Sequence, residues 1–118
     1  MLISLDKPQT QAALCCPPKG AGAPLTSETI ADLATRLKAI ADPVRLRLLT
    51  YLLDQPDSES CTCVLAPIVN LSEPTVSHHL KKLEASGLLT KERRGMSVYY
   101  RVVPESIHAI ASALHFEC

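Results

Sequence analysis

Residues 72–87 read SEPTVSHHLKKLEASG, and their pattern is the strongest indication of the fold class. Ser72 is a typical helix N-cap, and Gly87 is a typical residue just beyond a helix C-terminus, so a helix is predicted between them. One stripe of this helix is apolar at helical spacing and predicts a buried face: Val76, Leu80 and Leu83. The face opposite this stripe carries hydroxyl, imidazole and ammonium groups, which usually stay in solvent.

A hairpin is predicted after this helix, and a shorter helix before it. Residues 88–92 and 97–103 are rich in strand-forming side chains and are joined around Arg94-Gly95, which favours a turn. Upstream, residues 61–69 predict the shorter helix, which Pro67 would break unless it lay in the first turn. A short turn connects the two helices, and this is the order of a helix-turn-helix.

The rest of the chain divides into an arm and three more helices. Residues 1–26 contain four prolines and two glycines, and they predict a flexible N-terminal arm that carries a cysteine pair. Ser27 predicts the cap of a first helix, and Asp42-Pro43 starts a second helix that is apolar almost all round. Pro104 starts a last amphipathic helix. Residues 27–118 are therefore expected to be mainly α with a β-hairpin wing (α+β), a winged helix-turn-helix.

Length and composition limit the class of protein. The 118 residues fit one domain. No apolar run is long enough to span a bilayer and no secretory signal is visible, so we expect a cytoplasmic chain with no membrane or secreted partner. Five cysteines, an odd number, then indicate metal binding or redox chemistry more than a disulfide scaffold.

The basic residues are unevenly distributed, although the formal net charge is zero. Between residues 72 and 101 there are six basic and three acidic side chains, and a locally basic face attracts a phosphate backbone. The alternative is a merely solvated helix face. His79 borders the buried stripe and is interpreted first as structural. The candidate contacts to base edges and phosphates are Ser72, Thr75, Ser77, His78, Lys81, Lys82, Arg93 and Arg94.

Four cysteines form two close pairs, Cys61 with Cys63 and Cys15 with Cys16. The first pair begins the short helix, where non-helical dihedrals at the first residue let both sulfurs converge on one ion. A helix N-terminus lowers the pKa of a thiol, and thiolates select soft ions. Two sulfurs rarely make a tight site, so we expect the arm to fold over and add Cys15 and Cys16. The alternative is a small buried hydrophobic residue, which is a serious option for Cys63 alone; Cys118 is assigned no role.

Several stretches together resemble the ArsR/SmtB repressor family. Residues 42–49 (DPVRLRLL) resemble its second helix, residues 72–81 its recognition helix, and residues 87–89 with 95–101 its wing. The resemblance covers about residues 27–114 and implies a homodimeric winged-helix repressor paired through its first and last helices. We expect the ion-free dimer to bind operator DNA, and to release it when the cysteine thiolates capture a soft ion.

The cysteine spacing favours As(III) or Sb(III) as the inducer. Many arsenite sensors of the family carry a third cysteine one turn beyond the pair, where this chain has Ala66, so recruitment of the arm is favoured. Cadmium and lead sensors also add arm cysteines, but theirs are separated, whereas Cys15 and Cys16 are adjacent. Arsenite takes three sulfurs, and cadmium and zinc prefer four. Because four are available, a response to Cd(II), Pb(II) or Zn(II) is the alternative.

Other sites and other classes are weaker interpretations. The family's second, zinc-binding site would have to use Glu105, His108, His115 and Glu117, but its aspartate-x-histidine element is absent, so we interpret these as ordinary surface or interface residues. An enzyme, such as a thiol-disulfide oxidoreductase or an arsenate reductase, would need a Cys-x-x-Cys or an anion-cradling loop that the sequence lacks. A structural zinc protein and a metal-carrying chaperone are further alternatives, but a chaperone would not need the basic recognition face.

Overall fold

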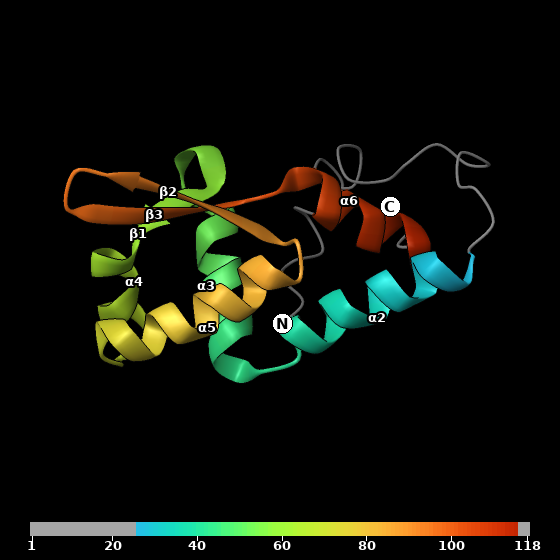
Figure 1. Cartoon of the computed structure of the whole chain (residues 1–118), viewed down its shortest axis with the longest axis horizontal. Coiled ribbons are helices and arrows are strands. Elements are labelled where there is room, and N and C mark those ends of the chain that lie inside the picture. Colours follow the sequence, from blue (N-terminus) through green and yellow to red (C-terminus); the bar gives the residue numbers. More distant parts are fainter. Residues whose placement is uncertain (1–25, 116–118) are drawn as a thin grey trace, which may run out of the picture.

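The structure is a computed structural model that describes residues 26–115. These residues form a winged helix-turn-helix that is mainly helical, as predicted (Figure 1). The α-helices are α2 (Ser27–Ile40), α3 (Pro43–Leu53), α4 (Thr62–Val69), α5 (Glu73–Ala85) and α6 (Pro104–Ala113). The strands are β1 (Glu59–Cys61), β2 (Leu89–Arg94) and β3 (Ser97–Val102), with a 3₁₀ turn at Pro56–Ser58 before β1. The predicted arm lies almost wholly outside the described residues.

Side-chain caps fix where α2, α3 and α5 start. The carboxylate of Asp42 accepts hydrogen bonds from the amides of Val44 and Arg45, which confirms the predicted start of α3. The hydroxyl of Ser72 accepts from the amide of Thr75, as predicted for α5. For α2 the prediction was wrong by one residue, because Thr26 rather than Ser27 supplies the cap. Each cap satisfies an amide that has no partner within its helix.

The short helix α4 follows directly from β1. Cys61 is its N-cap, with extended dihedrals, and its sulfur accepts a hydrogen bond from the Cys63 amide at 3.0 Å. The predicted short helix is present, and Pro67 lies inside it beyond the first turn without breaking it. Because proline lacks an amide hydrogen, α4 lacks the one hydrogen bond that residue 67 would otherwise donate to the Cys63 carbonyl. The helix ends at Asn70, whose left-handed conformation (φ 58°) suits this residue type.

The wing contains a third strand that the sequence did not predict. Strand β1 starts at Glu59, in the polar stretch before the short helix, and pairs antiparallel with β3. The strand order is β1-β3-β2, with Cys61 opposite Tyr99 in the register. Gly95 has φ 62° at the turn between β2 and β3, a conformation that glycine adopts without steric cost. The hairpin is therefore one side of a three-stranded sheet.

The core lies between the sheet and helices α3, α4 and α5. The predicted stripe of α5 is fully buried, since Val76, Leu80 and Leu83 are each 0% exposed. Helix α3 is central, but it is not buried all round, because Leu46 is 47% and Leu53 41% exposed. The largest fully buried side chains are Tyr100, Leu48, Leu52, Leu65, Leu80, Leu83, Leu88, Leu89, Val76 and Val102.

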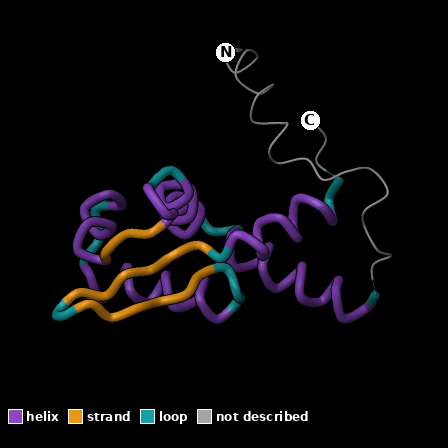
Figure 2. The backbone as a smooth tube through the Cα atoms, turned by 90° about the horizontal axis from the view of Figure 1, so that it is seen from above, coloured by secondary structure: helices purple, strands orange, loops and turns teal. Residues whose placement is uncertain are grey.

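Helices α2 and α6 lie side by side at the other end of the molecule, as Figures 1 and 2 show. No residue of α2 is buried, and large apolar side chains of α2 and at the C-terminal end of α6 are exposed to solvent. Ile30 is 52% exposed, Leu37 36% and Leu114 42%. Within residues 26–115, every helix falls short of the length and apolar content that crossing a membrane would require.

Candidate nucleic-acid interface and thiol site

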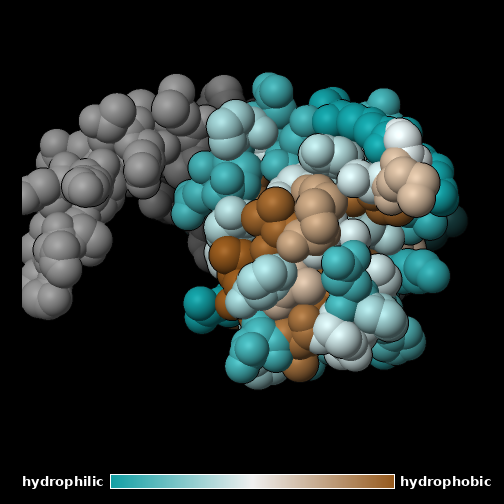
Figure 3. Space-filling view, turned by 90° about the vertical axis from the view of Figure 1, so that its left-hand side faces the viewer, coloured by the Kyte–Doolittle hydropathy of each residue, from teal (hydrophilic) through white to brown (hydrophobic). Residues whose placement is uncertain are grey.

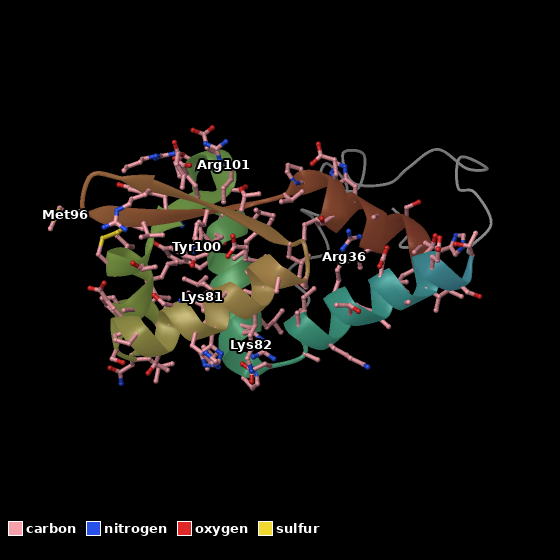
Figure 4. The ribbon with its side chains drawn as sticks, in the orientation of Figure 1. Arg36, Lys81, Lys82, Met96, Tyr100 and Arg101 are labelled. Atoms are coloured by element: carbon pink, nitrogen blue, oxygen red, sulfur yellow. A yellow bond between two sulfur atoms is a disulfide. The ribbon has the colours of Figure 1, made fainter. Side chains whose placement is uncertain are left out.

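Helix α5 presents a polar face away from the core. Of the predicted contact residues, His78, Lys81 and Lys82 are exposed, and Ser77 is half-buried at the edge of the face. Figure 4 labels Lys81 and Lys82 along α5. Because the apolar stripe fixes the rotation of the helix, these ammonium and imidazole groups are presented together. Such groups can bond phosphates and base edges.

Ser72 and Thr75 form the start of that face. Their hydroxyl oxygens are 2.9 Å apart, and the Ser72 oxygen also caps the Thr75 amide. Both residues are exposed. The N-terminus of α5 therefore offers hydroxyl groups already held in place, next to backbone amides that favour an anion.

His79 is a structural residue rather than part of the exposed face. Its side chain is 19% exposed, and its Nδ1 lies 4.0 Å from a carboxylate oxygen of Asp42. Within the described chain this nitrogen is buried and has no hydrogen-bond partner. Burial lowers the pKa of His79, an effect that the Asp42 carboxylate partly offsets. The imidazole therefore links α5 to the cap of α3, which agrees with the structural interpretation.

The two arginines predicted at the wing tip lie on opposite faces of the hairpin, because successive strand residues alternate. Arg94 donates to both carboxylate oxygens of Glu59, at 2.8 and 3.0 Å, and to Glu92 at 2.8 Å. Its guanidinium also lies over the Tyr99 ring, 4.3 Å from the centroid. Arg93 is exposed, and no ion pair within residues 26–115 involves it.

These contacts shift the acid-base equilibria on the outer face of the sheet. Hydrogen bonds from Arg94, and then from Arg101, lower the pKa of Glu59. The same pairing with Glu59 and Glu92 raises the pKa of Arg94. Arg94 is therefore held to the sheet, whereas Arg93, like Lys91 of the same strand, is exposed and outside these ion pairs.

The C-terminal end of α5 is held by one side chain from each of the two end helices. Arg36 of α2 donates to the Ser86 carbonyl at 3.4 Å, and the buried Ser106 of α6 donates to the Gly87 carbonyl at 2.6 Å. Gly87 has φ 88°, which favours glycine there. Figure 4 labels Arg36 between the two end helices and the α5 terminus. Sequence reasoning missed both donors, because nothing in their local pattern separates them from neighbouring helix residues.

The Cys61 and Cys63 sulfurs do converge at the start of α4, as expected from the position of this pair. They form a disulfide in this structure. Cys61 is 4% exposed, whereas Cys63 is exposed, so the pair lies at the surface and is not enclosed in the core. Disulfide sulfurs are not thiolates, and ion binding here requires reduction to two thiols.

The other predicted ligands give no complete metal site in the part of the chain that the structure describes. Cys15, Cys16, Glu117 and Cys118 lie outside residues 26–115. Within that range no three His, Cys, Asp or Glu side chains gather closely enough to hold a metal ion. His108 and His115 of the last helix region are exposed, as expected of ordinary surface residues.

Comparison with known proteins supports a DNA-binding regulator. The profile described as "Bacterial regulatory protein, arsR family" matches residues 42–91. The chain is 41% identical over 68 residues to the arsenic resistance transcriptional regulator ArsR1 of Pseudomonas putida, an alignment that covers 58% of this chain and 52% of that protein. It is 33% identical over 93 residues to the transcriptional repressor SmtB of Mycobacterium tuberculosis, covering 78% of this chain and 67% of that repressor.

A solved structure shares the same architecture. It is the solution structure of a homodimeric winged helix-turn-helix DNA-binding domain from Mycobacterium bovis, with a TM-score of 0.63 and 25% identity. The match covers 75% of this chain and 80% of that domain. Together with the exposed face of α5 and the wing, this defines a winged helix-turn-helix regulator.

The chain belongs to the arsR family of bacterial regulatory proteins. It spans about half the length of the Pseudomonas regulator that it matches. Since this is a family of regulators, the prediction that the chain is not an enzyme is confirmed.

Proposed function

We propose that the chain is a cytoplasmic, metalloid-responsive transcriptional repressor. As an ion-free homodimer it binds operator DNA, and it dissociates when arsenite or antimonite binds reduced cysteine thiolates. The observation that carries this proposal is the position of the thiol pair. Cys61 caps α4, and α4 leads through the short turn after Asn70 into α5, the helix with the exposed basic face.

Recognition of DNA is assigned to α5 and the wing. His78, Lys81 and Lys82 face the major groove, Ser72 and Thr75 approach a phosphate at the helix start, and Ser77 lies at the edge of the contact. Arg93 supplies a wing cation, whereas Arg94 supports the wing from its other face. Two copies joined through α2 and α6 place two α5 helices on successive major grooves. The apolar exposure of Ile30, Leu37 and Leu114 supports this pairing.

Ion capture is assigned to Cys61 and Cys63 with Cys15 and Cys16 of the arm. Reduced Cys61 and Cys63 supply two sulfurs, whereas arsenite takes three, so the arm completes the site. Val64, next to Cys63, is 43% exposed. Figure 3, which faces the end of the molecule with α4 and the wing tip, shows hydrophobic side chains gathered there. An arm that closes over the thiol pair would remove part of this apolar surface from water.

Release of DNA follows if the ion is more stable in the conformation with low DNA affinity. Closing the arm moves the start of α4, and the short connection passes this displacement to α5. By linkage, operator DNA must weaken ion binding by the same factor, and a tenfold factor needs only about 1.4 kcal/mol. A four-sulfur site for Cd(II), Pb(II) or Zn(II) is the competing proposal. It rests on the four cysteines that the chain offers, and the similarity to both an arsenic resistance regulator and an SmtB repressor does not separate the two proposals.

The test is a binding titration on a labelled DNA fragment from upstream of the chain's own gene. Fluorescence anisotropy of the reduced protein is recorded with arsenite, antimonite, Cd(II), Pb(II) and Zn(II) in turn. We expect arsenite and antimonite to lower the affinity at least tenfold. An equal affinity with and without saturating arsenite would refute the assignment, and a response to Cd(II), Pb(II) or Zn(II) alone would establish the competing proposal.

Cys63→Ser is the informative variant, because Cys63 is exposed and its replacement leaves the core unchanged. It should retain DNA binding and lose the arsenite response. Cys118→Ser is the matched control and should respond like the unmodified protein. Loss of DNA binding in the Cys63 variant would indicate a structural role instead.

A further inference from the structure

The outer half of the wing has little to hold it against the rest of the molecule. None of residues 91–98 is buried, and Met96 at the tip is 94% exposed. A hairpin of this kind is only marginally stable by itself. What positions it must come from the pairing of β3 with β1 and from side chains that cross between these strands.

Glu59 is the side chain that makes this crossing. It is the first residue of β1, and its carboxylate accepts two hydrogen bonds from Arg94 of β2 and two from Arg101 of β3. The Glu59 side chain is only 18% exposed. Exposed single ion pairs contribute little, but a shielded carboxylate shared by two guanidinium groups has the geometry in which such a network matters. One carboxylate thus joins all three strands.

The same short strand carries the thiol pair. Cys61 lies two residues after Glu59, so both side chains start from the same face of β1. Cys61 is opposite Tyr99 in the register, and the Arg94 guanidinium bound by Glu59 lies over the Tyr99 ring. Cys61 is also the last residue of β1 and the N-cap of α4. A displacement of β1 at Cys61 therefore reaches the wing through its backbone pairing and through Glu59.

We propose that Glu59 is a positioning residue that couples the state of the Cys61–Cys63 pair to the placement of the wing on DNA. This rests on the proposed function, and it adds a second route beside the one from α4 to α5. When the pair changes state, β1 shifts, and Glu59 carries Arg94 and the wing tip with it. The exposed Arg93 then moves relative to the phosphate that it contacts.

The first test compares Glu59→Gln with Glu92→Gln in the full-length chain. Both variants remove one carboxylate bonded to Arg94, but Glu92 belongs to the wing itself and makes no link to β1. Operator affinity is measured by anisotropy with and without saturating arsenite, and arsenite binding is followed separately through thiol protection. With Glu59→Gln the arsenite-induced loss of affinity should fall to about a third of the unmodified value, while arsenite still binds. The Glu92 variant should keep the full response, and an unchanged response in Glu59→Gln overturns the proposal.

The second test does not depend on the inducing ion. In full-length protein with Cys15, Cys16 and Cys118 replaced by Ser, only the Cys61–Cys63 pair changes redox state. A water-soluble phosphine attacks the disulfide and breaks the S–S bond. One water molecule then gives its oxygen to the phosphine, which becomes the phosphine oxide, and its two hydrogens to the sulfurs, which become two thiols. Hydrogen exchange of the amides of residues 91–98 is then compared between the two states by mass spectrometry.

We expect reduction to change these exchange rates at least about threefold with Glu59 or with the Glu92→Gln control, and by a smaller factor with Glu59→Gln, in which only the backbone pairing of β1 with β3 remains. No change with Glu59 present, or the same change in Glu59→Gln, overturns the coupling. If arsenite leaves DNA affinity unchanged while the exchange difference depends on Glu59, the proposed inducer fails and the coupling stands. The two failures are therefore distinguishable.

Discussion

The two ends of this molecule differ in how completely they bury their own apolar surface. At the end that carries the proposed DNA-binding face, α3, α4, α5 and the sheet enclose a core in which Leu48, Leu65 and Leu80 are fully buried. At the other end, α2 buries no residue, and Ile30 and Leu37 remain exposed. The first end buries its own apolar surface, whereas the second exposes apolar surface that a partner copy would cover. Variants at the two ends should therefore fail in different ways.

The largest expected effect is a loss of stability when a fully buried side chain is removed from the core. Leu80→Ala deletes a side chain that is 0% exposed beneath the reading face, and should lower the free energy of unfolding by about 2–5 kcal/mol. Urea denaturation followed by circular dichroism measures this loss.

Lys81→Ala is the matched control for Leu80→Ala, because it is the next residue and is exposed. It should leave stability unchanged, weaken binding to all DNA sequences, and lower the slope of log affinity against log salt by about one. An unchanged salt slope would remove Lys81 from the phosphate contacts.

A charge on the exposed apolar face of α2 should dissociate the proposed dimer without unfolding the chain. Leu37→Glu places a charge on the exposed apolar face of α2, where a partner copy would have to bury it. We expect a monomer in sedimentation velocity and an operator affinity about 100-fold lower, which corresponds to about 2.7 kcal/mol. Thr35→Glu puts the same charge on an exposed position of a different face of α2 and should remain dimeric. A dimeric Leu37→Glu protein would contradict pairing through α2.

A single hydrogen bond tests whether the two ends are joined. The Ser106 hydroxyl of α6 donates to the Gly87 carbonyl, and Ser106 is 5% exposed. Ser106→Ala leaves that carbonyl without this donor and should cost about 1–3 kcal/mol of stability. If α6 orients α5 in the dimer, operator affinity should also fall, while binding by the Ser112→Ala control should not. Equal operator affinities of the two variants would show that the hydrogen bond from Ser106 to the Gly87 carbonyl does not orient α5.

The fold was largely predictable where structure is local, apart from the cap of α2, and the larger misses were contacts between distant residues. The α5 pattern of Val76, Leu80 and Leu83 and the cap at Ser72 could be recognised within one turn or two of helix. Strand β1 is three residues long and mostly polar, and the strand with which it pairs, β3, lies far along the chain. No periodicity can reveal such a strand.

The candidate site was predictable to the same extent. The basic face of α5 followed from the helical wheel, and the convergence of Cys61 with Cys63 followed from their place at a helix start. Adjacent Arg93 and Arg94 looked equivalent in sequence, but the pleat of β2 places them on opposite faces. The Arg94 partner Glu59 is 35 residues away, so only the folded sheet shows which arginine is held.

The smallest expected effect is a pH dependence at the contact between α5 and α3. Burial favours the neutral imidazole of His79, so its folded-state pKa lies below the ordinary value of 6.5, with Asp42 partly opposing the shift. As pH falls through this window, the unfolded chain takes up a proton that the folded chain excludes, and the free energy of unfolding must fall. The nearby charges of Arg45, His78 and Lys82 act in the same direction as burial.

His79→Asn should flatten this decline between about pH 7 and pH 5, measured as the urea midpoint at each pH. The variant also loses ring packing, so its stability at pH 7 is compared separately from the slope. His78→Asn is the control, because its ring is exposed on the reading face. It should weaken DNA binding and keep the slope. If His78→Asn were the variant that flattened the curve, the titrating group would lie on the DNA-reading face, and the His79 imidazole would have only its packing role.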